Sequence, residues 1–345
     1  MFNRKEQRLC TSILHWYPRH WRDLPWRHTR DPYRILVSEI MLQQTQVDRV
    51  IPKYKEFLKR FPTLKHLAKA PVSEVIKAWK GLGYNRRALF LHQTAREIVL
   101  AYGGKFPRDL MLLKQLPGIG DYTARAILSF AFDEPMPVLD TNHRKFYQRT
   151  FFRGNVKKDA ILLKKAIEII HWLRPLPDPP PSAGSGQALP GEGNIKVKKN
   201  FALQNFSSQQ TTPPPPFGLA QGRLRGRRGG GLAPASIVYH WNQALMDFMT
   251  AVEKSSSSDP LVLFYNQAYP KPRKKKSKIA SIPFRETDRY IRGRIIDLLR
   301  EKKSETLKHV EKIFSDVDQK RLEKIIEGLK QDGMIVFAKQ RLRLP

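Results

Sequence analysis

The chain has 345 residues and a formal net charge of +32, from 63 lysines and arginines against 31 acidic residues. That charge favours a polyanionic partner, and nucleic acid is the first candidate. The single cysteine, Cys10, excludes a disulfide framework and any all-cysteine zinc or iron–sulfur site within the chain. No apolar run reaches the roughly 18 residues of a membrane span, and the charged N-terminus does not fit a secretory signal. We therefore expect a soluble, cytoplasmic, nucleoid-associated protein.

Residues 1–174 carry apolar side chains at helical spacing, with prolines and glycines between the runs. Leu36, Ile40, Val47 and Ile51 form one such run, and no strand-like alternation of any length occurs. The pattern predicts an all-α fold for this part of the chain.

Residues 175–235 differ in composition, because 11 prolines and 10 glycines fall within these 61 residues. Such a content without a repeat period is typical of disorder. Helical sequence resumes at Ile237 and runs to about Val252. We therefore treat 175–235 as an insertion, and assign 1–174 plus 236–265 to one domain.

The C-terminal part divides into a basic linker and a small module. Residues 266–282 contain six basic residues in eight at 271–278, which is typical of a solvated linker or a non-specific phosphate contact. Residues 283–345 show three helical faces, followed by a predicted strand at 334–337 and a basic partner strand near 341–344. Three helices and a hairpin follow the order of a winged helix, a module that binds either DNA or proteins.

The segment Leu116-Pro-Gly-Ile-Gly120 lies between two predicted helices, one ending near Gln115 and the other covering about 121–132. Two glycines let the turn bring backbone N–H groups close to an external anion at the start of the second helix. This is the pattern of a helix-hairpin-helix, which contacts phosphates without reading sequence. Any tight helix–helix turn is the structural alternative.

Two acidic residues are candidates for acid–base chemistry. In a helix over 37–47, Glu39, Gln43 and Gln46 would share one face, where partial desolvation would raise the pKa of the carboxyl so that it can donate a proton. A solvated helix face is the alternative. Asp140 precedes a helix from about Asn142, where it can serve as an N-cap or face a developing cation.

Aromatic residues flanked by arginines are candidates for contacts with bases. Trp26 lies in the segment Arg22-Asp-Leu-Pro-Trp-Arg27, which suits stacking on a base. Tyr84 lies in a glycine-flanked loop before Arg86 and Arg87, where it could enter a duplex as a wedge. Core packing is an equal alternative for Trp26 and Tyr84, as it is for Trp79.

Six segments between residues 24 and 142 form a further pattern. They are LPWR at 24–27, DPY at 31–33, SEIMLQQTQV at 38–47, GLGY at 81–84, LPGIG followed by YTA at 116–124, and LD followed by Asn at 139–142. In order and spacing they resemble the MutY family of adenine DNA glycosylases, in the helix-hairpin-helix glycosylase superfamily. WNQALMD at 241–247 resembles a later helix of that family. The resemblance implies a two-lobed helical core that removes adenine mispaired with 8-oxoguanine or guanine in base excision repair.

The resemblance also implies roles for individual residues. Glu39 matches the acid that protonates the departing adenine, and Asp140 the carboxylate that stabilises the sugar cation. Tyr122 stands where related lyases carry a nucleophilic lysine, which implies a monofunctional enzyme, and Asn142 neighbours the catalytic aspartate. The other implied residues are Arg22, Leu24, Trp26, Arg27 and Gln243 around the extruded adenine, Gln44 and Tyr84 inserted at the lesion, and Gly118 and Gly120 at the DNA backbone.

The chain departs from the family in two places. The family usually carries four cysteines after the WNQALMD-like helix, holding an iron–sulfur cluster, whereas residues 253–270 contain none. We therefore expect no cluster, packing through Leu261, Val262, Leu263 and Phe264 instead, and a buried apolar role for Cys10. The family's usual C-terminal domain, which helps to recognise 8-oxoguanine, is also replaced by the shorter module.

We expect a monomer that acts on double-stranded DNA containing A:8-oxoguanine or A:G mispairs, without metal catalysis. The resemblance allows a monovalent cation at the hairpin carbonyls of 116–120, although no residue requires one. Two other functions remain open at this point. One is a thymine or uracil mismatch glycosylase on the same scaffold, and the other is a DNA-binding protein without catalytic activity.

Overall fold

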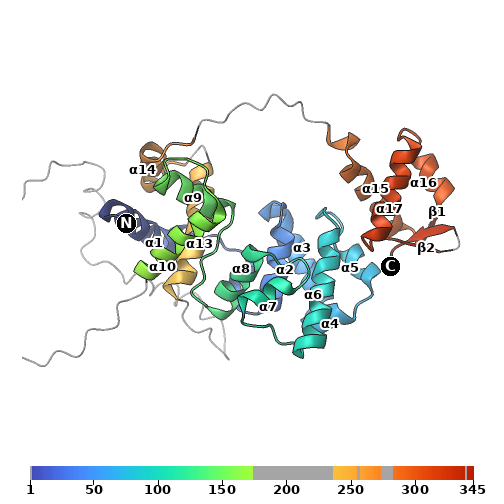
Figure 1. Cartoon of the computed structure of the whole chain (residues 1–345), viewed down its shortest axis with the longest axis horizontal. Coiled ribbons are helices and arrows are strands. Elements are labelled where there is room, and N and C mark those ends of the chain that lie inside the picture. The colour runs from blue at the N-terminus through green and yellow to red at the C-terminus, as the bar shows by residue number, and fades with distance from the viewer. Residues whose placement is uncertain (1, 174–235, 255–256, 273–282, 339) are drawn as a thin grey trace, which may run out of the picture. The chain divides into compact units, whose positions relative to one another are not determined.

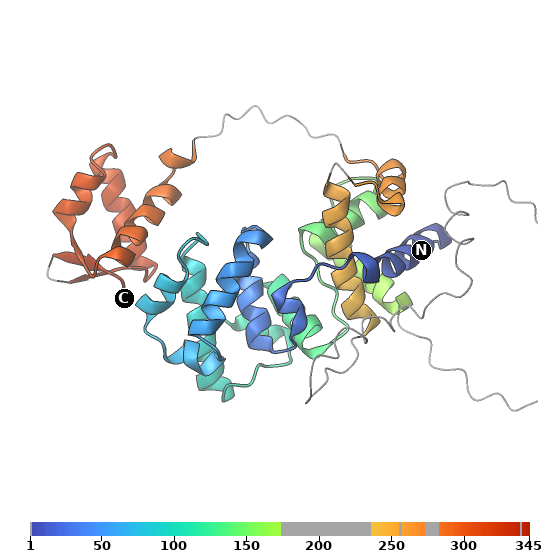
Figure 2. The same ribbon diagram turned by 180° about the vertical axis from the view of Figure 1, so that it is seen from behind.

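The computed structural model describes residues 2–173, 236–254, 257–272, 283–338 and 340–345 (Figures 1 and 2). The predicted insertion at 175–235 and most of the basic run at 271–278 lie outside the described residues. The chain forms two compact units, Met1–Arg22 with Pro135–Arg273, and Asp23–Glu134 with Lys274–Pro345. The all-α prediction is confirmed, with a small sheet near the C-terminus. No helix among the described residues is long and apolar enough to cross a membrane.

The first unit is a helical bundle around one apolar core. Its helices are α1 (Arg4–His20), α9 (Thr141–Phe151), α10 (Asp159–Leu173), α13 (Ile237–Glu253) and α14 (Pro260–Ala268). Helix α13 packs against the other four helices, and its Trp241 and Phe248 are fully buried. Cys10 lies in the same core as a small apolar residue, as predicted, and burial raises the pKa of its thiol.

Helix α14 lies within residues 253–270, the segment in which the family resemblance implies four cysteines and this chain has none. Asp259 accepts a hydrogen bond from the Val262 backbone N–H at 3.0 Å and another from Trp16 Nε1 at 2.9 Å. Leu261 and Val262 are buried as predicted, and Phe264 is half-buried. The prediction is wrong for Leu263, which is 54% exposed, because an isolated helix on a core surface buries only one face.

The second unit begins with a compact set of helices, in which α2 packs along α3, α6 and α8. Their bounds are η1 (Pro25–His28), α2 (Pro32–Leu42), α3 (Val47–Arg60), α4 (Leu64–Lys69), α5 (Val72–Ala78), α6 (Arg86–Tyr102), α7 (Leu110–Gln115) and α8 (Asp121–Phe132). The bounds of α7 and α8 agree with the helices predicted on either side of the 116–120 turn.

The 116–120 turn is fixed against α6. Gly118 has a φ of +74°, and a Cβ placed on it would lie 2.6 Å from the Cβ of Phe90. Thr94 Oγ1 donates to the carbonyl oxygen of Pro117 at 2.6 Å. Gly120 is the N-cap of α8, has ordinary extended backbone angles, and has open space where a Cβ would lie. Only Gly118 is therefore required by the packing of the turn.

The C-terminal module, residues 283–345, has three helices and a three-stranded sheet. In chain order its elements are η2 (Phe284–Glu286), α15 (Asp288–Glu301), β1 (Glu305–Thr306), α16 (Leu307–Ile313), α17 (Gln319–Gln331), β2 (Val336–Ala338) and β3 (Arg341–Arg343). Antiparallel β3 lies between β1 and β2, with Leu342 opposite both Glu305 and Phe337. The predicted three helices and hairpin are confirmed, while the two-residue strand β1 is too short to predict from periodicity.

The two glycines of the turn give a matched pair of substitutions. We expect Gly118→Ala to lower the free energy of unfolding by about 2 kcal/mol or more, because the new methyl group meets Phe90 and the backbone is left-handed. Gly120→Ala should cost less than about 1 kcal/mol, since it meets no atom and changes only the N-cap. Urea denaturation measures both values, and equal losses would contradict this account of the turn.

Candidate active site

Glu39 lies in the second unit on α2, where its side chain is only 6% exposed. Helix α2 packs along α8, whose first turn carries Tyr122. The acid and the tyrosine named from the sequence thus belong to neighbouring helices of the second unit. The structure confirms that Glu39 is not on a solvated face.

The predicted helix over 37–47 is interrupted. Helix α2 ends at Leu42, Gln43 is its C-cap, and Gln46 is the N-cap of α3. Gln43 and Gln46 therefore do not share a helical face with Glu39, and that prediction is wrong. The reason is a backbone reversal at Gln44, which has a φ of +56°.

The guanidinium of Arg87 holds this reversal in place. Its Nη1 donates to the carbonyl oxygens of Ile40 at 2.8 Å, Met41 at 3.0 Å and Gln43 at 2.5 Å. These are carbonyls at the C-terminal end of α2, which have no partner within the helix. A buried cation thus supplies the hydrogen bonds that a longer helix would have supplied. Burial lowers the pKa of Arg87 to about 10, which leaves it charged at neutral pH.

The same side chain also holds a second loop, which we call the Tyr84 loop (residues 81–87). Arg87 Nη2 donates to the carbonyl oxygens of Leu82 and Gly83, both at 3.1 Å, and to Thr45 Oγ1 at 3.0 Å. One guanidinium therefore links the Tyr84 loop to the turn that carries Gln44.

Gln44 and Tyr84, the two residues predicted to enter the DNA stack, have the same unusual backbone. Both have a left-handed φ, +56° for Gln44 and +46° for Tyr84, which non-glycine residues rarely adopt. Gln44 is exposed and Tyr84 is half-buried. Strain of this kind concentrates at functional loops, which agrees with the predicted role without testing it.

The tryptophans of the second unit belong to its core. Trp79 is fully buried, and Trp26 is buried with its ring edge-on to Tyr54 at 5.5 Å between centroids. Leu24 is buried as well, while Arg27 is half-buried. For Trp79 the core interpretation is correct, and Trp26 offers no open face for stacking without a rearrangement.

Asp140 lies in the first unit as the N-cap of α9, and its side chain is 21% exposed. The predicted N-cap is confirmed, because Oδ1 accepts from the His143 backbone N–H at 2.7 Å. The same oxygen lies 2.6 Å from His143 Nδ1, and the His143 side chain is fully buried. The carboxylate thus has a fixed orientation.

Burial by itself raises the pKa of the Asp140 carboxyl. The charge on His143, the hydrogen bonds from its ring and backbone, and one from the Asn142 backbone together outweigh that effect. The pKa of Asp140 therefore lies below its ordinary value, and the group is a carboxylate throughout the neutral range.

Other predicted residues of the first unit gather around α13. Arg22 Nε donates to Oδ1 of buried Asp247 at 2.6 Å, and its backbone N–H donates to Oδ2 at 3.0 Å. Asn142 Nδ2 lies 3.5 Å from the carbonyl oxygen of Met246. Gln243 is 5% exposed, and its Oε1 has no hydrogen-bond partner among the described residues. A buried amide oxygen of this kind is suited to accept a hydrogen bond from a ligand.

The residues of this chain do not fit the iron–sulfur cluster that the family usually holds. Such a cluster needs four thiolates, and the only cysteine is buried in the core of the first unit. No group of three or more metal-ligating His, Cys, Asp or Glu side chains occurs among the described residues.

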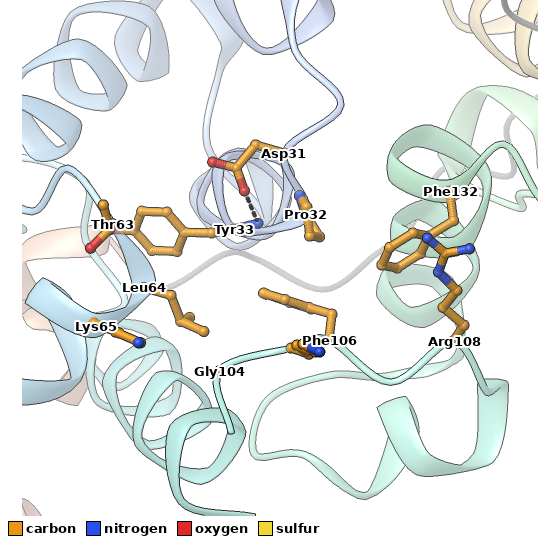
Figure 3. Close-up of a pocket in the computed structure, with 11 residues that line it drawn as sticks. Asp31, Pro32, Tyr33, Thr63, Leu64, Lys65, Gly104, Phe106, Arg108 and Phe132 are labelled. Carbon is orange, nitrogen blue, oxygen red and sulfur yellow. Dashed lines mark hydrogen bonds between the residues drawn. The ribbon is translucent and has the colours of Figure 1, made fainter. Parts of the chain in front are cut away.

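A cavity of about 740 Å³ lies elsewhere in the second unit, near the start of α2. Figure 3 shows its aromatic side chains, among them Phe106 and Phe132, with the Arg108 guanidinium 4.6 Å from the centroid of the Phe132 ring. The DPY segment at 31–33 lines this cavity, whereas none of the predicted catalytic, base-contacting or DNA-backbone residues does. It is therefore distinct from the residues assigned to chemistry.

Comparison with known proteins identifies the segment that carries these residues. Residues 37–171 match the HhH-GPD superfamily of base excision DNA repair proteins, a range that includes Glu39, Tyr122 and Asp140. The chain carries an HhH-GPD domain. The matched range crosses from the second unit into the first, so the domain draws helices from both.

Relatives of the HhH-GPD domain include adenine DNA glycosylases. The one from Mycobacterium tuberculosis is 45% identical over 140 residues, which are 40% of this chain and 46% of that protein. The human one is 46% identical over 140 residues, which are 38% of this chain and 26% of that protein. The chain thus spans less than half the length of these relatives. A solved structure of a thermostable thymine-DNA glycosylase is 34% identical, with a TM-score of 0.46, and the match covers 49% of this chain and 79% of that one.

Three important side chains of the HhH-GPD domain and its surroundings were not assigned from the sequence. The sequence patterns indicate Arg87 only as a basic neighbour of Tyr84, include Asp247 only within the WNQALMD segment, and give His143 no role. Each acts through a contact made in the folded chain. The spacing of His143 from Asp140, three residues across a helix start, was a signal that could have found it.

Arg87 offers a direct test of how the two loops are held. We expect Arg87→Met to lower the free energy of unfolding by about 3 kcal/mol or more, because several buried carbonyls lose their donor. The matched control is Arg86→Met, because exposed Arg86 makes one ion pair, with Asp332 at 3.3 Å, and its guanidinium lies 5.0 Å from the centroid of the Phe90 ring. Its loss should cost less than about 1 kcal/mol. Urea denaturation gives both numbers. Equal losses would show that Arg87 does not organise the loops.

The ionisation of Asp140 offers a second test. In His143→Leu the charge and the ring hydrogen bond of His143 are lost, while burial and the backbone N–H of residue 143 remain, so the pKa of Asp140 should rise; His143→Gln should give a smaller rise. A ¹³C NMR titration, assigned with Asp140→Asn, measures the pKa. Because the folded pKa is lowered, the stability due to Asp140 is present above the unfolded pKa of about 3.9 and is lost as the pH falls through the folded value. An unchanged pKa in His143→Leu would contradict the assignment.

Proposed function

We propose that the protein is a monofunctional DNA glycosylase that hydrolyses the N-glycosidic bond of adenine mispaired with 8-oxoguanine or guanine in duplex DNA. The observation that carries the proposal is the pair of acidic groups in the HhH-GPD domain. One is a carboxyl shielded from water, Glu39, and the other is a carboxylate held ionised, Asp140. The adenine DNA glycosylases to which the segment is similar support adenine as the base.

In this proposal Glu39 is the general acid. Adenine is a poor leaving group until a ring nitrogen is protonated, so the acid must deliver a proton as the bond from the sugar C1′ to the base breaks. Glu39 lies on α2 with only 6% of its surface exposed, so bulk water has little direct access to its carboxyl group. The bonding electrons leave with the base, and the protonated ring accommodates them.

Asp140 then stabilises the positive charge that develops on the sugar. Departure of the base leaves an oxocarbenium-like sugar, as in glycoside hydrolysis. Water then adds to C1′ and releases a proton, which replaces the one that Glu39 delivered. His143 fixes Oδ1 of Asp140 and keeps the group ionised at neutral pH. Tyr122 replaces a lysine nucleophile, so no Schiff base forms and the strand is left with an abasic site.

The remaining predicted residues account for access to the base. A base in a duplex must leave the stack before either acidic group can reach it, at a cost of a few kcal/mol. We assign the 116–120 turn to a phosphate, Gln44 and Tyr84 to the stack that the base vacates, and Gln243 to a hydrogen bond with the extruded adenine. The net charge of +32 favours the phosphate contacts, which weaken as salt rises.

Two substitutions test the chemistry. Glu39→Gln and Asp140→Asn should each lower single-turnover adenine excision from an A:8-oxoguanine duplex by about 100-fold or more, because each removes one catalytic group with little change in volume. Alkali-labile sites measure excision. Asparagine remains a good N-cap at position 140, so the stability of that variant should be kept. DNA binding, measured by fluorescence anisotropy, should persist in both variants.

The substrate is tested with duplexes containing A:8-oxoguanine, A:G, T:G and U:G pairs. Excision confined to T:G and U:G would move the assignment to a pyrimidine mismatch glycosylase. Binding without excision of any base would indicate a DNA-binding protein without catalytic activity. Full activity in Glu39→Gln would refute the assigned acid.

A further inference from the structure

Within the second unit, the C-terminal module packs against the helices of residues 23–134 and is not merely joined to them by the chain. Ile76 of α5 and Leu89 of α6 are part of the same buried apolar cluster as Ile291, Ile295 and Leu299 of α15. The module thus shares its core with the two helices that flank the Tyr84 loop. Figures 1 and 2 show α15 and α17 next to α5.

Polar contacts fix the orientation of the module on these helices. Arg300 Nε donates to the carbonyl oxygen of Ile76 at 3.0 Å, and Nη2 donates to Asn85 Oδ1 at 2.8 Å. Asp297 Oδ1 lies 2.5 Å from Nη1 of the same guanidinium. Because Asn85 follows Tyr84 directly, the module contacts the Tyr84 loop itself.

A second arginine of α15 contacts Tyr84 directly. The guanidinium carbon of Arg289 lies 3.5 Å from the centroid of the Tyr84 ring, and Nη1 donates to the phenolic oxygen. Arg87 lies 5.5 Å from the same centroid. The half-buried ring therefore has two guanidinium groups within 5.5 Å of its centroid, and one of them comes from a module outside the matched residues 37–171.

We propose that the C-terminal module positions Tyr84 for insertion into DNA, with Arg289 as the positioning residue. The proposal rests on the proposed function, since it assigns Tyr84 to the mispair. A tyrosine on a strained loop would lose side-chain freedom on entering a stack, and a ring already oriented by a guanidinium loses less. Arg289 thus increases the preference for a mispair over an undamaged pair without touching the reacting atoms.

A double-mutant cycle tests whether Arg289 acts through Tyr84. The readout is the ratio of the dissociation constants for an undamaged duplex and an A:8-oxoguanine duplex, measured with Glu39→Gln present in every protein so that no base is excised. We expect Arg289→Ala to lower this preference by about tenfold, the size of a partly desolvated cation–π contact. Tyr84→Ala should lower it at least as much. Adding Arg289→Ala to Tyr84→Ala should then leave the ratio of dissociation constants unchanged.

The matched control is Arg294→Ala, because Arg294 is exposed on the same helix and the substitution also removes one positive charge. It should weaken binding to both duplexes equally and leave the preference unchanged. Arg289→Lys, which keeps the charge without the planar guanidinium, should recover part of the preference.

A measurement without DNA separates this proposal from the proposed function. Nitration of Tyr84, followed by mass spectrometry, should be several-fold faster in Arg289→Ala than in the parent protein or in Arg294→Ala. Thermal unfolding of each variant checks that the module remains folded. Equal nitration rates, an unchanged preference in Arg289→Ala, or additive losses in the cycle would each overturn the proposal. A higher preference in Arg289→Ala would also overturn it, since the contact would then restrain Tyr84 from DNA.

Discussion

The hydrogen bonds of Arg87 are the constraint on which the arrangement of the second unit depends. A guanidinium has five donors in a rigid plane, and here two of its nitrogens reach the end of α2, the following turn and the Tyr84 loop. The end of α2 determines where Glu39 lies relative to the turn that carries Gln44. A lysine could not make this set of bonds, because its donors radiate from one nitrogen. The buried acid and the two side chains predicted to enter the DNA stack, Gln44 and Tyr84, therefore share one structural support.

Local signals in the sequence were sufficient for much of the fold. The glycines of the 116–120 turn, the cap at Asp140 and the apolar spacing after Ile237 act within one or two helical turns, so α7, α8, α9 and α13 were predictable. The end of α2 was not, because the group that ends it is Arg87, more than 40 residues further along the chain. The predicted face of Glu39, Gln43 and Gln46 failed for the same reason.

The candidate site was predictable in its residue types and less so in its environment. Glu39 and Asp140 followed from motifs, whereas the ionisation of Asp140 depends on the buried His143 ring and could not be read from spacing alone. Trp79 satisfies an aromatic pattern and belongs to the core. A sequence shows that an aromatic side chain is available, but the packing of its neighbours decides whether the ring meets solvent.

The division of the chain between its units has a consequence for how the protein is made. Helix α1 belongs with α13 and α14, so the first unit stays incomplete until more than 200 further residues have left the ribosome. Helices α2 to α8 emerge as one continuous stretch and can collapse on their own in the meantime. Contacts between such distant segments form slowly. During synthesis the apolar face of α1, with Leu9, Ile13 and Leu14, is therefore exposed longest, and it is the surface that a chaperone would have to shield.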